Sequence, residues 1–159
     1  MLAMTGNTIT LTEAREAHER WVEARPQVRE YNERQIRLGR HLGYVETILG
    51  RRRYLPELRS TDDGLRRAAE RMAINMPITG TSADLTKLAL RQVWELLGDK
   101  RNDLVNVVHD EIDLDTALPE AQVRAILQAG MVDYPTPILK LGVPIRIEVG
   151  FGNNWAEAH

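Results

Sequence analysis

The stretch Asn106–Asp115 constrains the fold more than any other part of this 159-residue chain. Apolar residues lead into the cluster His109–Glu111, and Ile112 and Leu114 then alternate with acidic neighbours. Alternation with a period of two is typical of a β-strand that buries one face. We therefore expect β-structure here, with Ile112 and Leu114 facing a core.

Two adjacent carboxylates, Asp110 and Glu111, follow the apolar run. A lone buried charge is costly to remove from water, so such a pair is a poor choice for packing. A hard cation such as Mg²⁺ would neutralise it, because Mg²⁺ prefers oxygen ligands and binds through one or two carboxylates and substrate phosphates. A turn with solvated acids is the alternative, and these residues alone leave both interpretations open.

The residue types present argue against other metal sites and against a membrane location. The chain has no cysteine, and its four histidines are scattered at positions 18, 41, 109 and 159, which disfavours zinc. It shows neither a secretory signal pattern nor an apolar run of the ~18 residues that span a bilayer. These features predict a cytoplasmic protein.

Charge is distributed unevenly along the chain, although the net charge is only −2. From Arg34 to Arg71, ten arginines stand against five acidic residues, a balance of +5. From Asp99 to His159, ten acidic residues stand against five lysines and arginines, a balance of −5. A basic half beside an acidic half suggests a polyanion on one side and a cation on the other.

The first part of the chain is predicted to be helical. After a loop over residues 1–9, the pattern Thr10–Glu13 is that of a capping box at a helix N-terminus. Pro26 interrupts this helix, and a second helix extends to about Gly39 or Gly43, consistent with proline in a first helical turn.

β-branched and aromatic residues on both sides of Gly50 predict a short hairpin within residues 43–56. The hairpin carries three consecutive arginines, Arg51, Arg52 and Arg53. Basic clusters often serve only solubility, yet arginine is the preferred side chain for phosphate recognition. The cluster alone leaves both interpretations open.

Two helices separated by Pro77 are predicted within residues 61–98. Asp62 or Asp63 can cap the first, and apolar residues recur at helical spacing over positions 85–97 in the second. Polar residues near the proline are interpreted as hydrogen-bonding partners around a kink: Asn75, Thr79, Thr81 and Ser82.

The last part of the chain is predicted to combine a helix with a strand. An amphipathic helix is expected over Pro119–Val132, followed by a connection at Pro135 and Pro137. Residues 143–151 alternate apolar with charged side chains, which predicts a strand with one buried face. Helices covering one face of a small antiparallel sheet make the expected fold α+β.

Four motifs occur in order along the chain: Gly43–Thr47 with Gly50–Pro56, Arg71–Pro77 with Gly80–Asp84, Val108–Ile112, and the ending Glu148–His159. Together they resemble the C-terminal portion of a family A DNA polymerase of the bacterial DNA polymerase I type. The resemblance covers about residues 10–159.

The resemblance implies a palm subdomain with attached helices. It implies that Asp110 holds catalytic Mg²⁺, that Glu111 is an accessory carboxylate beside it, and that His109 approaches the primer terminus. Arg71 and Asn75 would belong to a helix that tracks the DNA minor groove beside the new base pair. Residues four positions apart share one helix face, and donors aimed at minor-groove acceptors can check pair shape without reading sequence.

One departure from the family concerns Thr79, one helical turn beyond Asn75. Many relatives carry glutamine at this position, and threonine is too short for the same reach. The expected DNA interface nevertheless includes Thr79, together with the arginines Arg51, Arg52 and Arg53.

Several parts of a family A polymerase are not recognised in these residues: the second metal-binding aspartate, the fingers helix with its lysine and aromatic residue, the thumb and an exonuclease domain. A two-metal mechanism needs metals ~3.5–4 Å apart, which one aspartate cannot hold. We therefore expect a split subunit or a truncated product that needs a second polymerase chain. The sheet edge or apolar face left uncovered favours such an association.

The predicted function is thus the C-terminal part of a DNA-directed DNA polymerase, a nucleotidyltransferase of DNA replication and repair. Its partners would be a primer–template, deoxynucleoside triphosphates and Mg²⁺, in the cytoplasm of a bacterial cell or with a viral origin. The alternative is a non-catalytic DNA-binding or scaffolding remnant. A stand-alone metal hydrolase would lack further convergent ligands.

The domain prediction treats residues 1–159 as one part of a polymerase palm. Its segments are a loop (1–9), helices with the Arg-rich hairpin (10–60), a DNA-tracking helix pair (61–98), and metal-site strands with a helix and a C-terminal strand (99–159).

Overall fold

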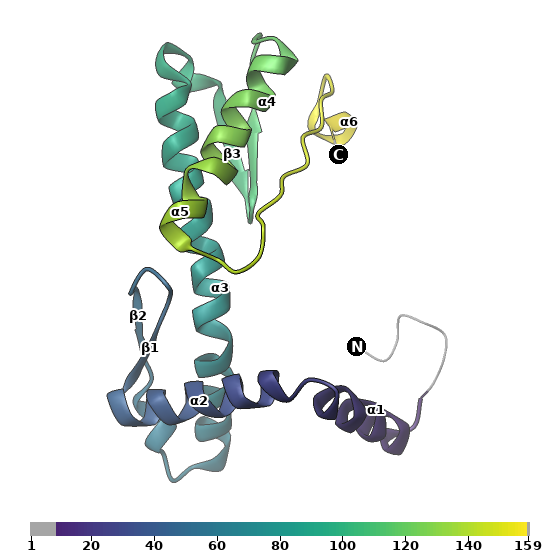
Figure 1. Ribbon diagram of the computed structural model, residues 1–159, viewed down its shortest axis with the longest axis vertical. Coiled ribbons are helices and arrows are strands. Elements are labelled where there is room, and N and C mark those ends of the chain that lie inside the picture. The colour runs from purple at the N-terminus through teal and green to yellow at the C-terminus, as the bar shows by residue number, and fades with distance from the viewer. Residues whose placement is uncertain (1–8, 159) are drawn as a thin grey trace. The chain divides into compact units, whose positions relative to one another are not determined.

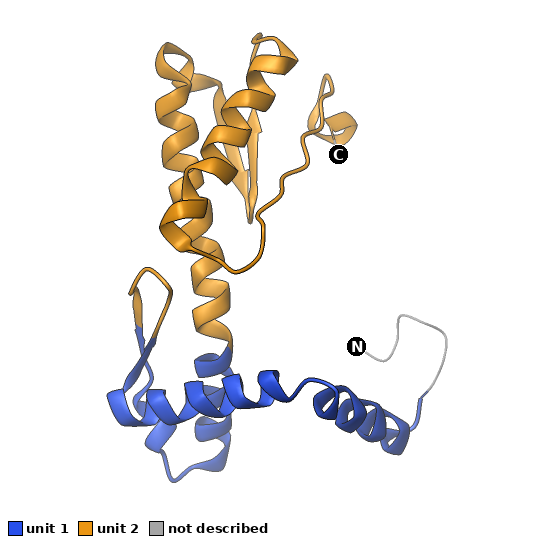
Figure 2. Cartoon of the chain, viewed as in Figure 1, with its two compact units in different colours: residues 1–45, 53–74 blue, residues 46–52, 75–159 orange. Residues whose placement is uncertain are grey.

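The computed structural model describes residues 9–158, which form helices and two small β-sheets (Figure 1). The loop expected over residues 1–9 lies outside this range except for Ile9, and so does His159 of the C-terminal motif. The chain divides into two compact units, coloured separately in Figure 2: unit 1 comprises residues 1–45 and 53–74, and unit 2 comprises residues 46–52 and 75–159.

Helix α1 (Leu11–Glu23) begins at the predicted capping box. The Thr10 hydroxyl accepts a hydrogen bond from the Glu13 backbone N–H at 3.2 Å, and the Glu13 carboxylate accepts one from the Thr10 backbone N–H at 2.7 Å. Two N–H groups that lack intrahelical partners are thereby satisfied. Because α1 buries none of its residues, local bonds of this kind contribute much of what holds it in helical form.

Helix α2 (Pro26–Leu42) has proline in its first turn and ends at Gly43, as the sequence predicts. Gly43 has a φ of 81°, a left-handed conformation that glycine adopts without a steric penalty. Gly39 is buried on the inner face of α2, where a Cβ atom would lie only 2.7 Å from the Leu58 side chain. The lack of a side chain at Gly39 therefore allows close packing in unit 1.

Strands β1 (Tyr44–Glu46) and β2 (Arg52–Tyr54) form the hairpin predicted around Gly50. The 3₁₀ helix η1 (Pro56–Arg59) follows β2. The core of unit 1 draws on this region, on α2 and on the start of the next helix, and its buried apolar residues include Val45, Leu55, Leu58, Ala69 and Ala73.

Residues Asp63–Leu96 form one helix, α3, in place of the predicted pair separated at Pro77. Proline removes one backbone donor and crowds the preceding turn, but small and apolar residues of α3 are buried on both sides of it in the sequence. The hydroxyls of Thr79 and Thr81 donate to carbonyl oxygens one turn earlier, at 3.0 and 2.5 Å. These threonines make local hydrogen bonds near the proline, but the predicted kink is replaced by a continuous helix.

Unit 2 contains an antiparallel hairpin of β3 (Leu104–Val108) and β4 (Glu111–Leu114), in which Val108 pairs with Glu111. The 3₁₀ helix η2 (Gly98–Asp103) connects α3 to β3. Ile112 is buried, as the alternation predicts. The core of unit 2 joins the hairpin, α3 and helix α4 (Glu120–Gln128), and its buried residues are Ala89, Val93, Leu97, Ile112, Val123 and Leu127.

Helix α4 continues through a π-helical turn, η3 (Ala129–Asp133), into α5 (Pro135–Leu139). The predicted helix is therefore confirmed, whereas the connection expected at the prolines is itself a short helix. Gly130 in η3 is buried, and a Cβ atom there would lie 2.5 Å from Val93. Glycine thus allows η3 to approach α3 closely.

Residues 143–151 do not form the predicted strand. The predicted alternation persists, because positions 145, 147, 149 and 151 are half-buried whereas 146 and 148 are exposed. A strand also needs a neighbouring backbone to pair with, and the β3–β4 sheet consists of two strands in the described chain. The segment instead packs its side chains against the core of unit 2 and leads to a last short helix, α6 (Trp155–Ala158).

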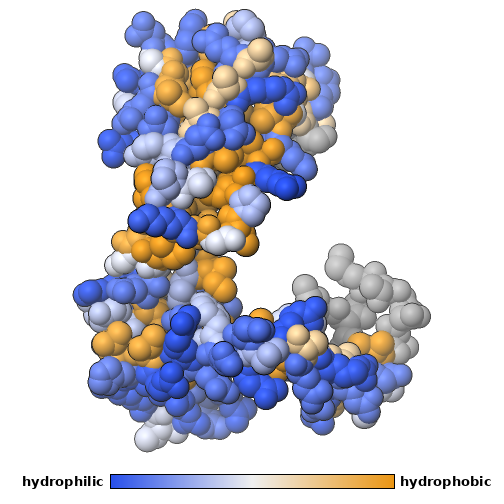
Figure 3. All heavy atoms as spheres, in the orientation of Figure 1, coloured by the Kyte–Doolittle hydropathy of each residue, from blue (hydrophilic) through white to orange (hydrophobic). Residues whose placement is uncertain are grey.

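The predicted α+β class, with small sheets packed on helices, is confirmed. Within residues 9–158, no helix is both long and apolar enough to cross a membrane. Apolar side chains also reach the surface of the molecule (Figure 3), and those of unit 2 include Val105, Val107, Ile138, Val143 and Trp155.

Candidate metal centre and nucleic-acid interface

The predicted metal-binding residues lie at the turn between β3 and β4. His109 and Asp110 are the two residues between the paired Val108 and Glu111. His109 has a φ of 56°, which suits a tight hairpin turn. The side chains of His109 and Asp110 are exposed, and Glu111 is half-buried. The structure therefore brings the three predicted residues together at one end of a hairpin.

The donor set at this turn fits part of a Mg²⁺ site. Asp110 and Glu111 supply charged oxygen atoms, which a hard cation prefers. No group of three or more His, Cys, Asp or Glu residues that could hold a metal ion occurs within residues 9–158. Nearby, Asn106 donates to the Asp113 carboxylate at 3.0 Å across the hairpin, so that acid has a protein partner. Two carboxylates can hold a cation only together with ligands from elsewhere.

Glu111 also has a partner that sequence reasoning did not assign. The indole Nε1–H of Trp155, in α6, donates to Glu111 Oε1 at 3.0 Å. Trp155 stands in the C-terminal motif, but no chemistry in that motif distinguishes it from a packing residue. Its contact joins residues 44 positions apart, which a local pattern does not reveal.

Arg51 of the hairpin cluster is engaged within unit 2. Its Nε donates to Asp84 Oδ1 at 2.8 Å, and its guanidinium also donates to the Gly80 carbonyl oxygen at 2.8 Å. The backbone N–H of Ile48 adds a bond to the Thr81 hydroxyl at 3.1 Å. These contacts tie the hairpin loop to α3. Asp84 is buried. An aspartate on the buried side of a helix is the sequence signal that could have revealed its ion pair with Arg51.

The other two arginines of the cluster are exposed. Arg52 lies 3.4 Å from the Glu46 carboxylate, and the Arg53 guanidinium lies 3.3 Å from the Met72 sulfur. Both side chains therefore present charge at the surface, where a polyanion could reach them.

Arg71, Asn75 and Thr79 occupy successive turns of α3, and all three are exposed. Four residues of helix advance by about 6 Å, and side chains at this spacing share a face. The Thr79 hydroxyl proton is used within the helix, since it donates to the Asn75 carbonyl oxygen at 3.0 Å. The expected groove-tracking face therefore presents an arginine and an asparagine, followed by a short side chain.

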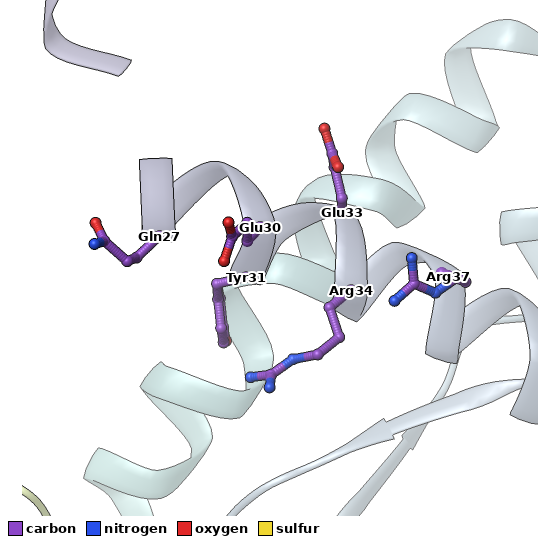
Figure 4. Close-up of a pocket in the computed structure, with 6 residues that line it drawn as sticks. All are labelled: Gln27, Glu30, Tyr31, Glu33, Arg34 and Arg37. Carbon is purple, nitrogen blue, oxygen red and sulfur yellow. The ribbon is translucent and has the colours of Figure 1, made fainter. Parts of the chain in front are cut away.

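A shallow hollow of about 390 Å³ is lined by residues of α2 alone. Figure 4 shows its side chains fanning out from the helix, with Tyr31 and Arg34 extending to the same side. The Tyr31 hydroxyl donates to the Ile74 carbonyl oxygen at 3.0 Å, and burial raises the pKa of Tyr31. The hollow contains none of the predicted site residues, and its lining mixes acids with arginines.

Comparison with known proteins identifies the family. The sequence model that represents the family described as DNA polymerase family A matches residues 2–157 of this chain. The chain belongs to this family. Thermostable DNA polymerase I of Thermus aquaticus is 40% identical over 150 residues, which are 94% of this chain and 18% of the relative. DNA polymerase I of Deinococcus radiodurans is 41% identical over 130 residues, which are 82% of this chain and 13% of the relative.

A solved family structure also matches this chain. It is the POL domain of Pol1 from M. smegmatis in complex with DNA primer–template and dNTP, with a TM-score of 0.82 and 34% identity. The match covers 94% of this chain and 26% of that chain. The resemblance inferred from four motifs is thus confirmed. The chain spans less than a fifth of the curated relatives described above, so most of a family A polymerase lies outside these residues.

Proposed function

We propose that this chain supplies the C-terminal, palm part of a DNA-directed DNA polymerase and contributes to template-directed nucleotidyl transfer. The observation that carries the proposal is the turn His109–Glu111, which presents an exposed Asp110 carboxylate beside Glu111 in a chain of DNA polymerase family A. Polymerases of this family generally depend on divalent metal ions, and the two carboxylates suit Mg²⁺.

In this proposal, Asp110 and Glu111 supply oxygen ligands, and His109 lies toward the primer terminus. Divalent cations, when bound, activate the primer 3′-oxygen and stabilise the leaving pyrophosphate. The tight turn fixes the backbone of the two ligands and leaves the Asp110 side chain accessible. The hairpin therefore positions the carboxylates before a substrate arrives.

The proposed DNA contacts come from α3 and from the Arg-rich hairpin. Arg71 and Asn75 are suited to minor-groove acceptors, whereas Arg52 and Arg53 are suited to phosphates. For Arg51 we propose mainly a positioning role, because its guanidinium already binds a buried carboxylate. The primer–template and dNTP in the related solved structure support DNA and nucleotide as partners.

We infer that polypeptide outside these residues, such as a second polymerase chain, supplies the fingers, the thumb and the other metal-binding aspartate. The β3–β4 sheet has two strands in the described chain, and Val105 and Val107 of β3 are 59% and 36% exposed. Each strand of a two-stranded sheet has an outer edge, and such an edge beside exposed apolar residues favours the addition of another strand. We place the assembled enzyme in the cytoplasm of a bacterial cell, in DNA replication and repair.

Primer extension with Asp110→Asn tests the metal role. In complex with an upstream polymerase segment, this variant should bind primer–template normally but lose nucleotide addition, because the change removes a ligand charge and little volume. Asp115→Asn, at an exposed position beyond the far end of β4, is the matched control and should retain activity. Near-normal extension by Asp110→Asn would show that the site assignment is wrong.

A further inference from the structure

The C-terminal segment is fixed to the core of unit 2 although it forms no strand. Figure 1 shows it leaving α5 as an extended chain that ends in α6. Ile147, Val149 and Phe151 pack against the core of unit 2. The guanidinium of Arg124, from α4, lies 4.7 Å from the centre of the Phe151 ring, a distance typical of a cation–π contact. This segment therefore has a defined position just before α6.

Helix α6 folds back onto this segment at two glycines. A Cβ atom at Gly150 would overlap the carbonyl oxygen of Ala158, and one at Gly152 would lie 2.5 Å from the Glu157 Cβ. The backbones approach so closely that no side chain fits at Gly150. Glycine is therefore required at both positions, because any side chain there would push α6 away from the extended segment.

Hydrogen bonds then fix the start of α6. The Glu157 backbone N–H donates to the Asn154 side-chain oxygen at 3.2 Å, and the Asn154 side-chain amide donates to the Glu157 carboxylate at 2.7 Å. The Asn153 backbone N–H donates to the same carboxylate at 2.9 Å. A four-residue helix is thus held by a reciprocal cap.

Trp155, the first residue of α6, is 58% exposed. A tryptophan at such a position contributes little to a core, so packing alone does not explain it. Its indole N–H reaches the Glu111 carboxylate at 3.0 Å. Because the indole nitrogen can only donate, it bonds one carboxylate oxygen of Glu111 and brings no charge to the site.

We propose that Trp155 is a positioning residue for Glu111. Its N–H holds one carboxylate oxygen, so that the carboxylate keeps one orientation beside Asp110. A partner that orients a metal ligand in this way commonly changes metal affinity by about 10–100-fold. The role in metal binding rests on the proposed function, whereas the contact between Trp155 and Glu111 does not.

Indole N–H signals in an NMR spectrum of the whole chain test the contact. The chain has three tryptophans, so Trp→Phe variants assign three signals. Glu111→Gln should shift the Trp155 signal and speed its exchange with water, while the Trp21 and Trp94 signals stay unchanged. A Trp155 signal that is indifferent to Glu111→Gln overturns the proposal.

The Gly150→Ala variant should change the Trp155 signal as Glu111→Gln does, because the added methyl group displaces α6. Gly142→Ala is the matched control, since a Cβ atom at Gly142 meets nothing within 4 Å, and its Trp155 signal should stay unchanged. A Trp155 signal that is the same in both glycine variants overturns the proposed anchoring of the indole by α6.

Mn²⁺ binding by the chain in complex with an upstream polymerase segment, measured by electron paramagnetic resonance, tests the positioning role. Trp155→Phe keeps an aromatic ring but loses the donor, and it should weaken Mn²⁺ binding about tenfold. Trp94→Phe is the control, because Trp94 is also partly exposed and stacks on Arg101 instead. Equal Mn²⁺ affinity in the two variants overturns the role. Neither measurement uses primer extension, so failure here is distinct from failure of the proposed polymerase function.

Discussion

Arg51 and Asp84 show how one buried side chain can change the role of an exposed one. Asp84 is buried, and its Oδ2 atom makes no hydrogen bond in the described structure. The carboxylate therefore depends on the Arg51 guanidinium at Oδ1 for compensation of its charge. A sequence with three consecutive arginines does not show that the first is committed to an internal ion pair while the next two remain at the surface.

Replacing Arg51 by alanine should lower the free energy of unfolding by roughly 2 kcal/mol, because Asp84 would remain buried without its cation. The partial exposure of Arg51 keeps the loss below that of a fully buried pair. Arg52→Ala is the control, since Arg52 and Glu46 form a surface pair that should contribute less than about 1 kcal/mol. Urea denaturation measures both, and equal losses would contradict a special role for Arg51.

Glu157 should titrate in a way that reports on the attachment of α6. Its pKa lies below the ordinary value of 4.5 because the Asn153 backbone N–H, and then the Asn154 and Asn153 side chains, bond its carboxylate. A lowered folded pKa means that the stabilisation is complete above pH 4.5 and is lost as the pH falls through the folded value. Asn154→Ala should raise the pKa of Glu157, as followed by carbon NMR of its carboxyl group. An unchanged pKa would show that the cap is not formed in solution.

Among the elements, α3 departs most from expectation. A proline inside a helix normally marks a break, yet α3 continues from Asp63 to Leu96. Because α3 is continuous, Arg71, Asn75 and Thr79 lie on successive turns of one helix. A break at Pro77 would have turned Thr79 away from Asn75, so the unbroken helix keeps these two positions of unit 2 on the face proposed to track DNA.

Changing Thr79 to glutamine tests this face. The longer side chain can reach a groove acceptor that threonine cannot, so Thr79→Gln should strengthen primer–template binding about fivefold or more in the assembled enzyme, because a good base contact contributes about 1–3 kcal/mol. Thr86→Gln is the control, because Thr86 also lies on α3 and donates to a carbonyl one turn earlier. Fluorescence anisotropy with labelled DNA measures both affinities. No difference between the variants would contradict alignment of α3 along the groove.

For the chain as a whole, the distribution of charge and the exposed apolar surface both indicate binding partners. The basic stretch 34–71 lies mostly in unit 1, and the acidic stretch 99–159 lies in unit 2. Unit 2 also exposes apolar residues on β3, and hydrophobic residues, in orange, are visible at the surface in Figure 3. DNA and further polymerase polypeptide, the partners proposed above, would cover the basic and the apolar surface respectively.

The isolated chain should therefore be inactive in primer extension and should self-associate, and an upstream polymerase segment should reverse both. Val105→Lys should reduce self-association, measured by analytical ultracentrifugation, because it places a charge on the exposed face of β3. Val143→Lys is the control, since Val143 is 69% exposed but lies outside β3. A monomeric, cooperatively folded chain that extends primers unaided would contradict this account.

Local chemistry made much of this structure predictable. The capping box at Thr10, the proline and glycine that bound α2, and the hairpin around Gly50 depend on residues a few positions apart, so the sequence contains all the partners. Burial of Ile112 likewise follows from the period of its own strand. The cluster His109–Glu111 could be located for the same reason, because one tight turn assembles it.

Contacts between distant segments decided the rest. Residues 143–151 have the periodicity of a strand, but a ladder needs a neighbouring backbone that periodicity does not supply. Pro77 signals a break, but burial of α3 on both sides of it in the sequence outweighs the lost bond. The bond from Trp155 to Glu111 spans 44 positions. Such partners are chosen by packing in three dimensions, where the free energy of the whole core, and not of one segment, decides which contacts form.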